Sequence, residues 1–71
     1  MGSKSILAIF GTNVQKYRKE RQWSQEKLAE VASVHRTYVG MIERAEKNIT
    51  LCTMEKIAKA LNVEIKNLLE K

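Results

Sequence analysis

The 71-residue sequence has no proline, no aspartate and only three glycines. Proline and glycine interrupt helices and mark turns, so their scarcity favours a compact helical chain. The sequence also has a single histidine and a single cysteine, and it lacks a glycine-rich phosphate loop. These residues are too few to build a nucleophile with its base or a metal site. We therefore expect no enzyme activity, no cofactor, no metal and no small-molecule substrate.

Cys52 is the only cysteine, which excludes an intrachain disulfide and a zinc cluster built from thiolates. We expect its side chain to be a small buried hydrophobe, and a thiol without a partner suits a reducing cell interior. No apolar run approaches the ~20 residues that span a bilayer, and residues 6–10 lack a signal-peptide cleavage site. We therefore expect neither a membrane partner nor secretion. We assign no function to Met1–Ser3, whether native or left from expression.

Hydrophobic residues make up 44% of the sequence, enough for the core of one small domain. Thirteen lysines and arginines against eight glutamates give a net charge of +5. Many soluble domains carry such a charge, so alone it indicates little. On the same surface as a helix that enters a DNA groove, it would supply the attraction to phosphates that drives nonspecific binding.

The spacing of apolar residues predicts five helices and no strands, which is an all-α fold. Ser24 and Thr50 are good N-caps, and His35 takes the same place before the third helix. The predicted ranges are 5–21, 24–31, 36–44, 50–62 and 64–70. The predicted core-facing residues are Ile6, Phe10, Val14 and Tyr17 in the first helix, Leu28, Ala29, Val31 and Ala32 in the second, and Met54, Ile57, Ala58 and Leu61 in the fourth.

Residues 24–44 are predicted to form two short amphipathic helices joined by a tight turn at residues 32–34. This arrangement is typical of a helix-turn-helix, whose second helix lies in the major groove of DNA. Such turns favour glycine because one residue is left-handed, and here Ser33 takes that place. Small Ala29 allows the two helices to cross closely.

On the predicted third helix, Val39 and Ile42 face inward. The predicted outward residues are Arg36, Thr37, Gly40, Met41 and Arg44. An arginine can donate two parallel hydrogen bonds to guanine, to O6 and N7. Such a contact discriminates against other bases by about 1–3 kcal/mol. Thr37 offers a hydroxyl to a base or a methyl to thymine, and a solvated surface is the alternative for Arg36 and Thr37. Gly40 either leaves room for DNA or is a tolerated substitution, and both interpretations stay open.

We predict base contacts by Arg36, Thr37 and Lys47, with a phosphate contact as the alternative for Lys47. The predicted phosphate contacts are Ser24, Gln25, His35, Tyr38, Arg44 and Asn48. A half-buried Tyr38 ring with its hydroxyl outside is compatible with that role. His35 has no second histidine and no cysteine at ligand spacing, which argues against a metal site. Arg18 and Glu43 lie on the buried sides of their helices, so we predict that they pair.

These segments resemble the Cro/C1 (XRE) family of helix-turn-helix regulators over about residues 14–69. The matching motifs are R-K-E-R-Q-W-S-Q-E-K-L-A-E, H-R-T-Y-V-G-M-I-E-R, N-I-T-L and N-V-E-I-K-N-L-L. The resemblance implies a compact five-helix bundle of the lambda-repressor type. It also implies that Gln25 contacts phosphate and braces the reading helix, and that Arg18 and Glu43 form an internal salt bridge.

Within that family, H-R-T-Y-V-G-M-I-E-R-x-x-K-N-I-T-L is most similar to the controller proteins of restriction-modification systems. Those proteins usually show R-T-Y-[IV]-S-x-I-E-R followed by a basic residue and Asn, so Gly40 replaces a common Ser and Ala45 a usual Gly. The resemblance implies a bacterial cytoplasmic protein, on the nucleoid when bound. It implies a homodimer that binds double-stranded DNA at near-palindromic operators and both activates and represses its own gene and the nuclease gene. RNA polymerase is a further candidate partner.

We treat residues 1–71 as one domain, with a reading unit at about 24–44 and a dimerisation segment at about 49–71. This last segment has more apolar residues than one small core needs. The predicted dimer interface consists of Ile49, Leu51, Val63, Ile65, Leu68 and Leu69. A fifth helix packed wholly within the monomer is the competing interpretation. The alternative functions are a phage-type or antitoxin-type repressor of the same fold and a protein-interaction module that does not bind DNA.

Overall fold

The computed structural model describes residues 5–71, and within this range it contains helices and no strand. The five helices are α1 (Ile6–Glu20), α2 (Gln25–Ala32), α3 (Arg36–Glu43), α4 (Leu51–Leu61) and α5 (Ile65–Leu68). The predicted all-α, five-helix fold is therefore confirmed. Met1–Ser3, to which the sequence assigns no function, lie outside the described residues, as does Lys4 at the start of the predicted domain.

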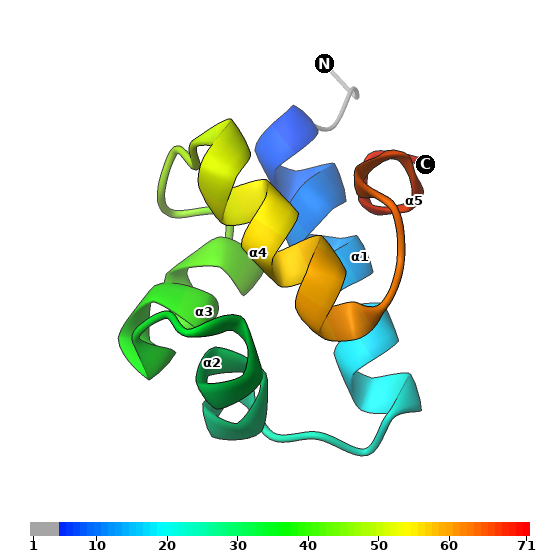
Figure 1. Ribbon diagram of the computed structural model, residues 1–71. Coiled ribbons are helices and arrows are strands. Elements are labelled where there is room, and N and C mark those ends of the chain that lie inside the picture. The colour runs from blue at the N-terminus through cyan, green and yellow to red at the C-terminus, as the bar shows by residue number, and fades with distance from the viewer. Residues whose placement is uncertain (1–4) are drawn as a thin grey trace.

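Helices α2, α3 and α5 pack around α1 and α4 (Figure 1). Helices α2 and α3 contact each other; α3 also contacts α1, and α2 also contacts α4. On the other side of the molecule, α5 contacts both α1 and α4. Among residues 5–71, no other helix covers the outer side of α3, which lies at the edge of the molecule opposite α5.

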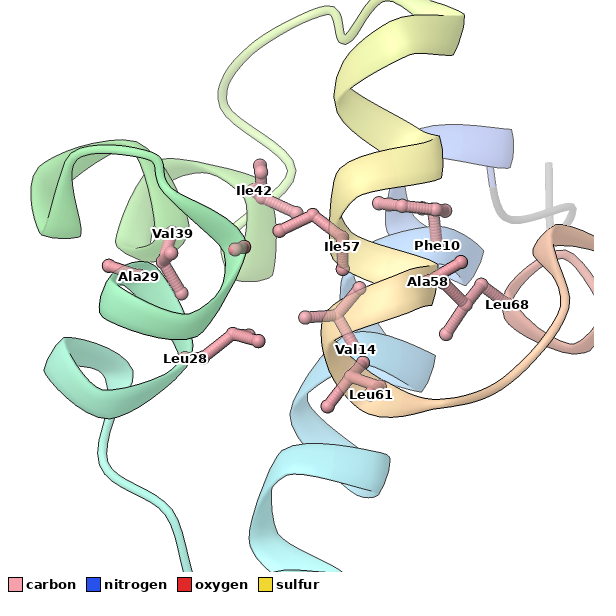
Figure 2. Close-up of a cluster of buried hydrophobic side chains, with 11 residues drawn as sticks. Phe10, Val14, Leu28, Ala29, Val39, Ile42, Ile57, Ala58, Leu61 and Leu68 are labelled. Atoms are coloured by element: carbon pink, nitrogen blue, oxygen red, sulfur yellow. The ribbon is translucent and has the colours of Figure 1, made fainter.

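The core fills the space between α1, α4 and the α2–α3 pair (Figure 2). Leu28 of α2 points toward Val14 of α1, and Val14 lies between Ile57 and Leu61 of α4; all four side chains are fully buried. Full burial of a side chain of this size contributes about 1.5–3 kcal/mol relative to exposure. The same core therefore holds α2 and α3 in a fixed place on α1 and α4.

The helix ends follow local rules that the sequence shows in part. The side chains of Ser5, Ser24, His35 and Thr50 each accept a hydrogen bond from a backbone N–H in the following helical turn. After four of the helices the chain turns through a left-handed residue that is not glycine, namely Gln22, Ser33, Ala45 and Asn62. The left-handed turn predicted at Ser33 is thus confirmed. Ala45, at a φ of 59°, takes a conformation that costs an L-residue about 1–2 kcal/mol.

Gly11 of α1 allows the backbone of α3 to come very close to α1. A Cβ built on Gly11 would lie 2.3 Å from the backbone oxygen of Ile42 and 3.1 Å from that of Glu43. Real Cβ atoms do not come so near to backbone oxygens, so the end of α3 can rest on α1 only where α1 has no side chain. No prediction from the sequence involved Gly11, although a glycine inside a helix costs about 1 kcal/mol relative to alanine and can mark such a contact.

Three predicted core positions are wrong. Ile6 is 56% exposed, because it lies in the first turn of α1, one turn before the buried Phe10. Val31 is 43% exposed, since the buried side of α2 follows Leu28, Ala29 and Ala32 instead. Cys52 is exposed as well. It lies in the first turn of α4 and falls off the face that buries Ile57, Ala58 and Leu61.

Helix α5 is shorter than predicted, and hydrogen bonds join its end to α1. The Asn13 side chain donates to the backbone oxygens of Leu68, at 2.9 Å, and Glu70, at 2.7 Å. Leu68 itself is fully buried in the core beside Phe10 and Ala58 (Figure 2). Its assignment to a dimer interface is therefore wrong, because the monomer already removes this side chain from solvent. The other five predicted interface residues keep exposed surface, and Leu51 is the most exposed at 73%.

Candidate nucleic-acid interface

The start of α2 and the outer side of α3 meet in a shallow, open depression of about 650 Å³. It is lined by Arg18, Ser24, Gln25, Glu26, Arg36, Thr37, Gly40 and Arg44. Five of these were predicted from the sequence as DNA contacts. The fold thus brings together these residues around the ends of α2 and α3, and Arg18 of α1 joins them.

Arg36 and Thr37 form the exposed first turn of α3. The His35 Nδ1 accepts a hydrogen bond of 3.2 Å from the Thr37 backbone N–H, so His35 caps the helix as predicted. The Arg36 Nη1 donates to the Glu26 Oε2 at 2.9 Å, and the two side chains remain 66% and 70% exposed. An exposed pair of this kind contributes only about 0–1 kcal/mol to folding, so the guanidinium is available to another acceptor.

A buried ion pair fixes α3 behind these residues. The Arg18 Nε donates to the Glu43 Oε2 at 2.7 Å and the Arg18 Nη2 to the Glu43 Oε1 at 3.0 Å, with only 10% and 2% of the side chains exposed. This is the pairing predicted from the sequence. The Arg18 Nη1 also donates to the backbone oxygen of Trp23 at 2.7 Å, which ties the turn before α2 to the same centre.

Gln25 is held by the same carboxylate. Its Nε2 donates to the Glu43 Oε1 at 3.0 Å, so the first residue of α2 is bonded to the last residue of α3. Each bond to an ionised group of this kind is worth about 1.5–3 kcal/mol net. The Arg18, Glu43 and Gln25 side chains therefore fix the angle between the two helices of the helix-turn-helix and the position of Arg36 and Thr37.

The predicted outward arc of α3 is wrong at two positions. Gly40 is buried, and Met41 is half-buried. A Cβ on Gly40 would lie 3.2 Å from the Arg44 Nη1 and 3.4 Å from the Gln25 Oε1, so the ends of these two side chains close over it. The groups nearest to Gly40 are thus the ends of the Arg44 and Gln25 side chains.

The remaining predicted contact residues surround the depression or lie away from it. Ser24 lines the depression and caps α2 by accepting a 2.9 Å hydrogen bond from the Lys27 backbone N–H. Tyr38 is half-buried against the core. Lys47 and Asn48 are exposed in the loop between α3 and α4, and Asn48 lines a separate, mostly apolar hollow beside the start of α1.

Glu26 is the one residue of the depression that the sequence analysis did not single out as a binding or bracing residue. Its pairing with Arg36 spans ten positions and depends on the angle between α2 and α3, so no sequence spacing predicts it. Within residues 5–71 no three histidine, cysteine or glutamate side chains are grouped closely enough to hold a metal ion. Over the same residues, none of the helices combines the length and the apolar character that crossing a bilayer requires.

Comparison with known proteins identifies the family. The sequence profile described as helix-turn-helix matches residues 14–68. The control protein C.SmaI of Serratia marcescens is 48% identical over 64 residues, which are 90% of this chain and 76% of that protein. The crystal structure of the restriction-modification controller protein C.AhdI from Aeromonas hydrophila superposes with a TM-score of 0.84 at 37% identity, over 87% of this chain and 94% of that one.

A structure that contains DNA is also similar. The crystal structure of SinR, the master regulator for biofilm formation, in complex with DNA has a TM-score of 0.81 at 35% identity, over 86% of this chain and 98% of that one. The helix-turn-helix of α2 and α3, its bracing ion pair and these similarities lead to one assignment. The chain belongs to the helix-turn-helix family of DNA-binding transcription regulators, together with the controller proteins of restriction-modification systems.

Proposed function

We propose that this chain is a restriction-modification controller that reads a near-palindromic operator as a homodimer, with Arg36 and Thr37 contacting base edges. The observation that carries the proposal is the exposed first turn of α3, held on a buried ion pair. Positions fixed in this way suit base reading, because a side chain must be placed accurately to bond two atoms of one base edge. Ser24, Gln25, His35, Tyr38 and Arg44 would then contact phosphates around it.

The proposed dimer uses apolar surface that the monomer leaves open. Leu51 is 73% exposed in the first turn of α4, while Ile49, Val63, Ile65 and Leu69 are half-buried. A twofold axis through this segment would repeat α3 on the same face of a duplex, about 34 Å away, which is one turn of DNA. We infer that the two copies of α3 read the two halves of one operator.

The rest of the proposal follows from the controller assignment. Occupancy of the operator would set whether the dimer represses or activates its own gene and the nuclease gene, and activation would use a contact with RNA polymerase. We propose that the protein acts in the bacterial cytoplasm and has no catalytic activity.

Replacing Arg36 by alanine should remove specificity while leaving general attraction to DNA. We expect Arg36→Ala to weaken binding to a preferred duplex by about 1–3 kcal/mol, because one bidentate contact to guanine is lost. Binding to a scrambled duplex should change little, since phosphates supply that affinity. Fluorescence anisotropy with both duplexes, the preferred one selected from a random pool by the wild-type chain, measures the two affinities.

Lys59→Ala is the matched control for Arg36→Ala, because Lys59 is an exposed cation on α4 outside the depression. It should leave the ratio of the two affinities unchanged. An equal loss on both duplexes in Arg36→Ala would contradict base reading by this residue.

The role of Lys47 can be decided by salt dependence. If Lys47 contacts a phosphate, Lys47→Ala should reduce the slope of log affinity against log salt concentration by about one unit. If it contacts a base, the slope should stay near the wild-type value and the preferred sequence should change instead. Titrations at four or more salt concentrations, followed by a new selection with the variant, separate these outcomes; no change in either would show that Lys47 does not touch DNA.

A further inference from the structure

Glu26 puts a negative charge on the surface that is proposed to meet DNA. It lies in the first turn of α2 and lines the depression together with Arg36 and Thr37 of α3. A carboxylate in this place repels phosphates and weakens attraction to every duplex alike. Within residues 5–71 it is the only carboxylate that lines the depression, so its effect on binding is concentrated at the reading turn.

The carboxylate also holds the reading guanidinium. The Arg36 Nη1 donates to the Glu26 Oε2 at 2.9 Å. A guanidinium has five N–H donors, so the Nε and Nη2 groups remain for the two parallel bonds that guanine accepts. Arg36 has a long side chain, and an exposed arginine loses considerable rotamer freedom when DNA fixes it. A partner that already restrains Arg36 reduces this loss for the duplex that fits.

We propose that Glu26 is a positioning residue that raises sequence discrimination, by restraining Arg36 and by weakening binding to duplexes that Arg36 does not fit. The inference rests on the proposed function, namely that Arg36 reads a base. In the fitting complex the smaller loss of Arg36 rotamer freedom offsets the repulsion from phosphates. In other complexes no base fixes Arg36, so the repulsion is not offset and the difference between the two affinities grows.

Glu26→Gln tests this, because glutamine keeps the size and the acceptor oxygen and removes the charge. The matched control is Glu30→Gln, which removes the same charge one helical turn later on α2, at an exposed position outside the depression. The probes are the duplex selected by the wild-type chain and a scrambled duplex of equal length. We expect Glu26→Gln to tighten binding to the scrambled duplex and to lower the affinity ratio by about tenfold. Glu30→Gln should leave the ratio unchanged.

A double-variant cycle separates positioning from a role in folding. In the Arg36→Ala background, Glu26→Gln should cause no further fall in the ratio, since the residue it positions is gone. If Glu26→Gln lowers the thermal midpoint but keeps the wild-type ratio, Glu26 only stabilises the start of α2 and the inference is overturned. The inference is also overturned if Glu26→Gln changes the affinities for both duplexes by the same factor as Glu30→Gln. If the wild-type chain selects no duplex at all, the proposed function itself fails, and this inference with it.

Discussion

Replacing Glu43 by alanine is expected to destabilise the fold by about 3–5 kcal/mol, because the Arg18 guanidinium would stay buried without its carboxylate. The variant also removes the acceptor of the Gln25 side chain, which bonds α2 to α3. Domains of this kind have a total stability of about 5–15 kcal/mol, so the loss takes a large part of it. Urea unfolding followed by helical circular dichroism and by the fluorescence of Trp23, the single tryptophan, measures the change.

The control is Glu46→Ala, which removes a carboxylate from an exposed pair with Arg44 at 3.0 Å. Glu46→Ala should lower the stability of the fold by about 1 kcal/mol at most, because solvent screens such pairs. The variant that lacks both Arg18 and Glu43 side chains should lose less stability than the two single changes added together. Similar small losses in Glu43→Ala and Glu46→Ala would contradict a structural role for the buried pair.

Replacing Gly11 by alanine is expected to destabilise the fold by about 1–3 kcal/mol. The new methyl group would lie 2.3 Å from the Ile42 backbone oxygen, and neither α1 nor α3 can move away without opening the core. The general preference of helices for alanine over glycine, about 1 kcal/mol, acts in the opposite direction but is smaller than the cost of separating two helices. Thermal and urea unfolding of the variant measure the net effect.

Gly40→Ala provides the same substitution in a different environment. Its methyl group would meet only the ends of the Arg44 and Gln25 side chains, and Arg44 is 57% exposed and held only by the exposed pair with Glu46. We expect this variant to gain up to about 1 kcal/mol from helix propensity. Opposite signs for the two glycines support a close backbone contact at Gly11, whereas equal effects would show that α1 and α3 do not approach there.

The sequence predicts the helices and their caps well, because these depend on neighbouring residues. Apolar spacing places all five helices, and Ser24, His35 and Thr50 cap α2, α3 and α4 where the sequence indicates. The pairing of Arg18 with Glu43 is also predictable, since two opposite charges on buried helix sides have few ways to avoid the cost of burial.

What the sequence does not predict depends on how helices meet. The contact of Gly11 with α3 and the pairing of Glu26 with Arg36 are set by distances between helices, which periodicity does not contain. The burial of Leu68 has the same origin, because it requires α5 to fold back onto α1 through Asn13. The sequence therefore predicted which residues of α3 line the depression. Only the structure shows that Glu26 lines it too and that Gly40 is buried.

Protection of guanine N7 from methylation by dimethyl sulfate tests most directly whether the first turn of α3 contacts base edges in the major groove. Guanine N7 lies in that groove and is one of the two atoms an arginine bonds. On the selected duplex, the wild-type chain should protect guanines in two blocks about one helical turn apart, and Arg36→Ala should lose this protection at a concentration that keeps the duplex bound. A fully bound duplex whose guanines all stay reactive at N7 would contradict such contacts.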